Sequence, residues 1–138
     1  MMHFEYKITG GDFTQAGRAS SEVKKVLKQL GVDHKIIKRT VIALYEAEVN
    51  IAAHANKGII KVVIEPDMIK AVLKDEGPGI PDIPLAMTKG YSTASKTVRE
   101  MGFGAGMGLP NIRENVDDLK IDSVVGEGTT LELTNYIR

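Results

Sequence analysis

The chain has 138 residues, of which 43% are hydrophobic, and its 18 lysines and arginines balance its 18 aspartates and glutamates. This length supplies one hydrophobic core, so we expect a single domain over residues 1–138, and the balanced charge favours neither nucleic acid nor a membrane as partner. Because the chain has no cysteine, disulfides and a thiol nucleophile are excluded, and a reducing cytoplasmic location is expected.

The first part of the chain predicts a short strand followed by a helix. Residues 3–8 alternate between apolar and polar side chains, as in a half-buried strand. Apolar side chains then recur at helical spacing over residues 12–30, with Asp12 or Thr14 available as the N-cap and Gly31 as the stop. We therefore expect the first amphipathic helix to begin close to these caps.

A second helix is predicted to begin at the N-cap Asp33 and to end near residues 56–58. Glu46 and Asn50 lie four residues apart on it and therefore share one face. Polar neighbours usually just face water, but here they interrupt a helix that is apolar nearly all round. A buried carboxylate needs a partner such as a metal, a water or a substrate hydroxyl. The Asn50 oxygen suits Mg²⁺, and Glu46 would then accept a proton from an attacking hydroxyl.

The remaining regular elements predict a mostly antiparallel sheet. Residues 59–65 and 68–75 form one predicted hairpin, and residues 109–119 form a short helix before a second hairpin at 120–137. The segment from residue 76 to 108 is too long for an ordinary connection. This order of elements predicts an α+β fold, with helices on one face of a mixed, mostly antiparallel sheet.

The sequence DEGPGI, from Asp75 to Ile80, follows the first hairpin directly. Its composition is typical of an ordinary turn. It also fits a loop that binds a base, in which Asp75 accepts a hydrogen bond from an exocyclic amine such as that of adenine. Gly77 and Gly79 would then let the base lie flat against the backbone.

The sequence GFGAGMGLPNI has a glycine at every second position from Gly102 to Gly108 and then becomes helical. A flexible loop would explain it, as would a backbone that approaches phosphate oxygens beside the positive end of a helix. A Walker-type loop needs Lys and Ser or Thr after its last glycine, whereas Leu109 follows Gly108. A dinucleotide-binding motif would need these glycines after the first strand of a parallel unit. Neither motif therefore fits this sequence.

Four motifs occur in a fixed order: Glu-x-x-x-Asn on a helix, Asp-x-Gly-x-Gly after a hairpin, Gly-x-Gly-x-Gly-Leu at a helix start, and Gly-x-Gly-Thr between strands. This series resembles the GHKL ATPase superfamily (Bergerat fold, histidine kinase-like) from Phe13 to Ile137. The length and the residues after Asp75 resemble the small anti-sigma factor and switch-protein serine kinases. The insert KTVREMGFGA is longer than the corresponding loop of the switch kinases.

The resemblance implies a two-layer α/β sandwich that binds ATP and Mg²⁺, with residues 82–108 as a nucleotide lid. It implies that Glu46 is the general base, that Asn50 is the Mg²⁺ ligand, and that Asp75 binds the adenine amine. The further nucleotide-binding residues that it implies are Gly77, Gly79, Ile80, Gly102, Gly104, Gly106, Met107, Gly108, Leu109 and Thr129.

The activity implied is that of a protein serine/threonine kinase, which phosphorylates a serine of a small regulatory protein of the anti-anti-sigma type. The alternative is an ATP-dependent anti-sigma protein that sequesters a sigma factor and has little kinase activity. A protein partner is expected in both cases, and a homodimer is left open.

Overall fold

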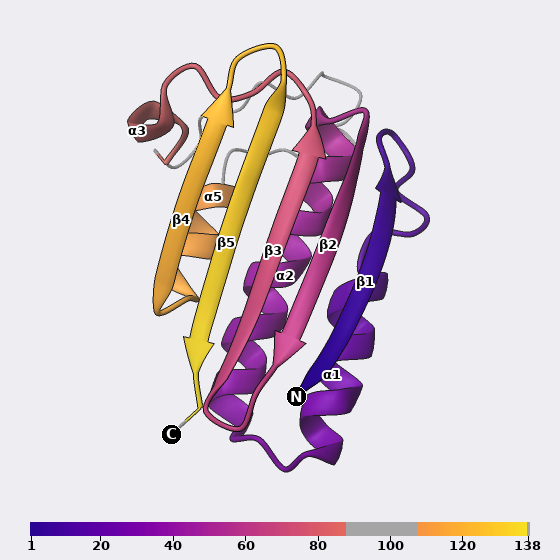
Figure 1. The fold of residues 1–138 in the computed structure, drawn as a ribbon, viewed down its shortest axis with the longest axis vertical. Coiled ribbons are helices and arrows are strands. Elements are labelled where there is room, and N and C mark those ends of the chain that lie inside the picture. Colours follow the sequence, from indigo (N-terminus) through magenta and orange to yellow (C-terminus); the bar gives the residue numbers. More distant parts are fainter. Residues whose placement is uncertain (88–107, 138) are drawn as a thin grey trace.

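The computed structural model describes residues 1–87 and 108–137 and shows one sheet with its helices on a single face (Figure 1). Within these residues, strand β1 is followed by two helices, a hairpin, two short helices and a second hairpin. The elements are β1 (Met2–Thr9), α1 (Arg18–Gln29), α2 (His34–His54), β2 (Lys57–Ile64), β3 (Met68–Glu76), α3 (Ile83–Ala86), α5 (Gly108–Glu114), β4 (Asp118–Val124) and β5 (Gly128–Tyr136).

The strands lie in the order β1-β2-β3-β5-β4, and each of these four neighbouring pairs is antiparallel. Alternate side chains of the strands face α1, α2 and α5, which cover the rear face of the sheet in Figure 1. At the centre of this layer, Val23, Leu27, Ile60 and Ile112 are 0% exposed. The predicted α+β fold and both predicted hairpins are therefore confirmed.

The predicted start of the first helix is wrong. Helix α1 begins at Arg18, and its N-cap is Gly17, which has a left-handed backbone (φ 95°) and no capping side chain of its own. Asp12 is engaged elsewhere, because its carboxylate accepts a hydrogen bond from the backbone N–H of Thr14 at 3.1 Å. The N-terminal N–H groups of α1 are instead satisfied from a distant residue, Glu48, as described below.

Two predicted helix ends also lie too far along the chain, and in both cases sheet pairing explains the difference. Helix α2 begins after its predicted cap Asp33 but ends at His54, because the Asn56 N–H donates to the Glu76 carbonyl at 2.9 Å. Helix α5 ends at Glu114, since the Asp117 N–H donates to the Thr134 carbonyl at 3.0 Å and thus begins the ladder between β4 and β5. In the described ranges, no helix has the length and apolarity needed to cross a membrane.

Candidate functional site

The side chain of Asn50 on α2 lies against the first residue of α5. A Cβ atom at Gly108 would come within 2.7 Å of the Asn50 Oδ1 atom and 2.9 Å of Nδ2. Real Cβ atoms do not approach other heavy atoms this closely, so a larger residue at position 108 would displace the Asn50 side chain. The backbone at the start of α5 and the amide oxygen proposed to bind Mg²⁺ are therefore brought together.

One turn earlier on α2, the half-buried side chain of Glu46 also contacts α5. The Asn111 Nδ2 atom donates a hydrogen bond to the Glu46 Oε1 atom at 3.3 Å. Sequence reasoning missed Asn111, although its distance of three residues from Gly108 places the two on one face of a helix. Glu46 and Asn50 thus occupy the same interface between α2 and α5.

At the end of β3, Asp75 pairs with the start of β5. Its Oδ1 atom accepts a hydrogen bond from the Thr129 N–H at 3.0 Å. Burial raises the pKa of the Asp75 carboxyl, and the hydrogen bond from Thr129 opposes this rise. A Cβ atom at Gly128 would lie 2.0 Å from the Asp75 carbonyl oxygen, so this glycine allows the close approach. The DEGPGI motif and the Gly-x-Gly-Thr motif therefore meet in space.

The rest of the DEGPGI loop is fixed by the turn between β4 and β5. Gly79 has a φ of 76°, and a Cβ atom there would lie 2.5 Å from the Val124 carbonyl oxygen. The Ile80 N–H donates to the Ser123 hydroxyl at 2.7 Å, and that hydroxyl is 2.9 Å from the Thr129 hydroxyl. Ser123 was missed because nothing in its own sequence environment distinguishes it from an ordinary strand residue.

Gly77 connects the loop to helix α2. A Cβ atom at Gly77 would lie 3.1 Å from the Cα atom of Ala55, which is the C-cap of α2, and 3.2 Å from the Asp75 Oδ1 atom. Asp75 therefore lies near the C-terminal end of the helix that carries Glu46 and Asn50. The structure gathers these residues at one end of the molecule, where Figure 1 shows the loop after β3 and the turn between β4 and β5.

Some predicted positions lie outside the described residues, namely Gly102, Gly104, Gly106 and Met107. Of the predicted lid, only residues 82–87 and 108 are described. Leu109 is half-buried and packs against the hydrophobic core beside the start of α5. The phosphate-binding role of the glycine-rich segment therefore remains a prediction.

The most deeply buried carboxylate on α2 is Glu48, which sequence reasoning passed over in favour of Glu46. Glu48 is 1% exposed, and it accepts hydrogen bonds from three backbone N–H groups at the start of α1. The donors are Gly17 at 3.0 Å, Ala19 at 3.1 Å and Ser20 at 2.8 Å. Burial raises the pKa of the Glu48 carboxyl, while these N–H groups lower it. The partner of the buried carboxylate is therefore a helix terminus.

The residues of the site fit a nucleotide that brings its own metal ligands. Within residues 1–87 and 108–137, no three His, Asp or Glu side chains gather into a metal site. Mg²⁺ typically takes one or two protein ligands and completes its coordination with phosphate oxygens and water. The Asn50 amide, which lies against the backbone of Gly108, would provide such a single ligand.

Comparison with known protein families covers most of the chain. Residues 11–135 match the family described as the histidine kinase-like ATPase domain, and the chain belongs to that family. Membership of an ATPase domain family implies that the chain binds ATP.

Two curated relatives and one solved structure place the chain further. It is 34% identical over 119 residues to the serine/threonine-protein kinase RsbT of Bacillus subtilis (strain 168), which covers 83% of this chain and 84% of RsbT. It is 37% identical over 100 residues to the anti-sigma F factor of Thermoanaerobacter sp. (strain X514), covering 69% of this chain and 66% of that protein.

The structure of the RsbU and RsbW domains of Rv1364c from Mycobacterium tuberculosis matches 98% of this chain with a TM-score of 0.62 and 19% identity. This chain spans 33% of the length of that one, and at this identity the match shows the fold alone.

Proposed function

We propose that the chain is a protein serine/threonine kinase that phosphorylates a small regulatory protein of the anti-anti-sigma type. The observation that carries this proposal is the position of Glu46, one turn from Asn50 and in contact with α5 through Asn111. A protein that only binds ATP needs no carboxylate base beside its metal ligand. The name of RsbT, which states serine/threonine kinase activity for that protein, supports the same function.

The proposed site has one end that binds the adenine base and another that binds the phosphates. At the base end, the Asp75 carboxylate accepts a hydrogen bond from the adenine amine, while Thr129 holds its other side. At the phosphate end, Asn50 would hold Mg²⁺, which when bound offsets the negative charge of the phosphate oxygens. Glu46 removes the proton from the serine hydroxyl of the partner as its oxygen attacks the γ-phosphorus. The bond to the bridging oxygen breaks, and ADP leaves with the electron pair.

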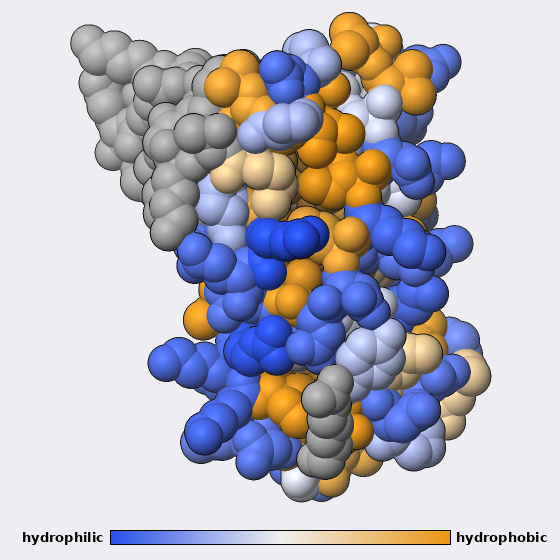
Figure 2. Space-filling model, turned by 90° about the vertical axis from the view of Figure 1, so that its left-hand side faces the viewer, coloured by the Kyte–Doolittle hydropathy of each residue, from blue (hydrophilic) through white to orange (hydrophobic). Residues whose placement is uncertain are grey.

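Sequestration of a sigma factor is the second candidate function. It would use the same ATP-binding site but a different surface for the partner. The name anti-sigma F factor, given to a relative, supports it. A groove of about 560 Å³ runs along the side of the molecule that carries β4, and charged residues of both signs, including Arg113, Asp118 and Lys120, line it. On this side, hydrophobic surface lies between hydrophilic side chains (Figure 2). Such a mixed surface is suitable for a protein partner.

Incubation of the purified chain with γ-labelled ATP and a cell lysate tests the proposal. We expect one small protein to be labelled on serine or threonine. The Asn50→Ala variant should lose Mg²⁺-dependent ATP binding in titration calorimetry and should label nothing, because it removes the amide oxygen beside Gly108. If the wild-type chain binds Mg-ATP but labels no protein, the kinase proposal fails and sequestration takes its place.

A further inference from the structure

We propose that Asn111 is a positioning residue that orients the Glu46 carboxylate for proton transfer; this inference rests on the proposed kinase function. In the described part of the chain, Glu46 makes a single hydrogen bond, from the Asn111 Nδ2 atom to Oε1. A carboxylate only accepts, so Asn111 must present its NH₂ group here. The Oε2 atom is left with no hydrogen bond from the described residues, and it is the oxygen available to a substrate hydroxyl.

Helices α2 and α5 meet in a regular pattern that links the base to the metal ligand. Gly108 lies against Asn50, and three residues later Asn111 contacts Glu46, which is one turn before Asn50. The two helices are therefore antiparallel where they meet. A single short helix thus borders the proposed Mg²⁺ ligand with its first residue and holds the base with its next turn.

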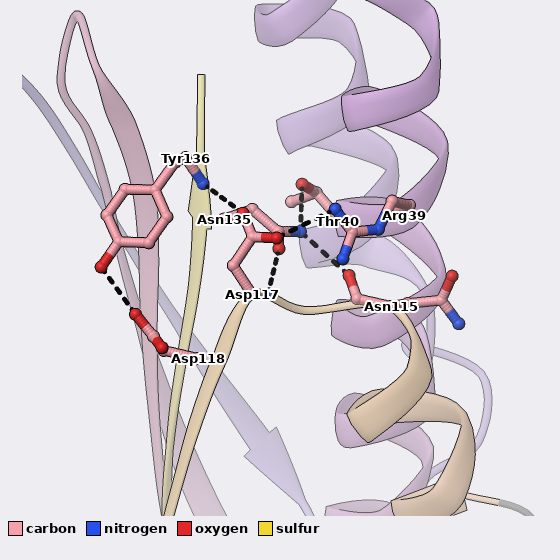
Figure 3. A network of polar contacts seen from close by, with 7 residues as sticks. All are labelled: Arg39, Thr40, Asn115, Asp117, Asp118, Asn135 and Tyr136. Atoms are coloured by element: carbon pink, nitrogen blue, oxygen red, sulfur yellow. Dashed lines mark hydrogen bonds and ion pairs between the residues drawn. The ribbon is translucent and has the colours of Figure 1, made fainter. Parts of the chain in front are cut away.

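Helix α5 is itself fixed at its far end by the polar network shown in Figure 3. The Asn115 Nδ2 atom donates to the Asn111 carbonyl at 2.8 Å. The buried Asn135 side chain donates to the Asn115 carbonyl and to the Thr40 hydroxyl, both at 3.0 Å. Because Thr40 belongs to α2, the network joins α5 to the same helix that carries Glu46. The backbone of Asn111 is therefore held, and its side chain has a defined place from which to donate.

The distance of 3.3 Å between Asn111 Nδ2 and Glu46 Oε1 is at the long end for a hydrogen bond. Hydrogen bonds of catalytic groups are often long before substrate is present and shorten in the complex. We therefore expect the contact to shorten when nucleotide and substrate are bound. Asn111 would then fix the direction of the free Glu46 oxygen at the moment of transfer.

Steady-state kinetics of phosphoryl transfer test this role. Asn111→Leu keeps the volume of the side chain but removes the donor, and we expect kcat to fall by about 10²-fold while KM for ATP changes by less than about threefold. The matched control is Asn115→Leu, the same substitution one turn later, whose side chain donates to a carbonyl and not to Glu46. That variant loosens the backbone of Asn111 but leaves its amide donor in place, so it should lose thermal stability while kcat falls by less than about tenfold. If Asn111→Leu keeps its kcat, or loses kcat no more than Asn115→Leu does, the proposal is overturned.

Two further measurements separate this inference from the kinase proposal. Asn111→Gln retains an amide donor and should recover at least about tenfold of the lost kcat. A double-mutant cycle in thermal unfolding, with Asn111→Leu and Glu46→Ala singly and together, reports the contact without any phosphoryl transfer. We expect the loss of Tm in the double variant to be smaller than the sum of the single losses. If wild-type protein transfers nothing, the kinase proposal fails alone; if the losses of Tm add, the positioning contact itself is overturned.

Discussion

Helix α2 carries two glutamates on opposite sides, and they differ in burial and in their hydrogen-bond partners. On the side of α1, Glu48 is 1% exposed and accepts three backbone N–H groups. On the side of α5, Glu46 is half-buried and accepts one N–H from a side chain. Two residues along a helix correspond to a rotation of about 200°, so the pair points to opposite neighbours. A carboxylate whose acceptors are filled stabilises a helix, whereas one with unused acceptor capacity is available to take a proton.

The largest expected effect separates the two glutamates by stability. Glu48→Ala leaves three buried N–H groups without an acceptor, and we expect the free energy of unfolding to fall by about 3 kcal/mol or more. Urea denaturation followed by circular dichroism measures this change. The matched variant Glu46→Ala should cost less than about 1 kcal/mol, because its side chain makes one hydrogen bond and is half-buried. Equal losses in the two variants would contradict the distinction.

The complementary prediction separates them by reactivity. Glu46→Gln keeps the shape of the side chain but cannot accept a proton at neutral pH, so phosphoryl transfer should fall by about 10²-fold while Mg-ATP binding persists. Glu48→Gln, assayed at a temperature where it is folded, should transfer at a rate within about threefold of wild type. Labelling of the partner and titration calorimetry measure the two properties. Loss of binding and transfer together in Glu46→Gln would mean that Glu46 is structural.

Asp75 is intermediate between the two glutamates, because the described residues donate a hydrogen bond to one of its two carboxylate oxygens. One oxygen accepts a hydrogen bond from the Thr129 N–H, and the proposed bond from the adenine amine would use the other. We expect wild type to prefer ATP over GTP by roughly 10²-fold, because guanine presents a carbonyl oxygen at that position. In Asp75→Asn, the amide oxygen can keep the Thr129 bond while the NH₂ group faces the base, so the preference should narrow by about tenfold. Equal binding of ATP and GTP by wild type would make Asp75 an ordinary turn residue.

The smallest expected effect concerns pH. Burial raises the pKa of Glu48, so between the usual carboxyl pKa and this raised value the folded chain keeps a proton that the unfolded chain has lost. Stability from this group is therefore fully present below the usual pKa and is lost as the pH rises through the raised one. The free energy of unfolding, wild type minus Glu48→Gln, should decrease as the pH rises above the usual carboxyl pKa. An increase over this range would show that the three N–H donors outweigh burial.

Much of the sheet could be predicted from sequence because strand alternation and hairpin turns are local signals. Pro66-Asp67 and the Gly-Glu-Gly turn mark where both hairpins reverse, and the pairing of β2 with β3 and of β4 with β5 follows from them. The start of α1 could not be predicted, because its cap is supplied by Glu48, 28 to 31 residues away from its donors. Helix signals read locally placed the cap at Asp12 or Thr14, the nearest suitable side chains.

In the candidate site, too, local sequence signals predict some features and tertiary packing determines the others. The spacing of Glu46 and Asn50 fixes their common face on one helix, whereas their contacts with α5 were not predicted and depend on how the two helices pack. Asn111 and Ser123 escaped notice because each acts through a residue on another element, and only the packing of those elements defines the contact. The rotation of α2 about its own axis places Glu48, and not Glu46, against α1. Tertiary packing sets that rotation.

The capping of α1 by Glu48 also sets an order of events during folding. The ribosome makes α1 first, but the carboxylate that closes its N-terminus is added about 30 residues later, near the middle of α2. Until α2 docks, the N–H groups of Ala19 and Ser20 have only water as partners, and short isolated helices are marginal in water. Helix α1 therefore becomes stable as a consequence of docking, and the exchange protection of these two amides reports when that step has occurred.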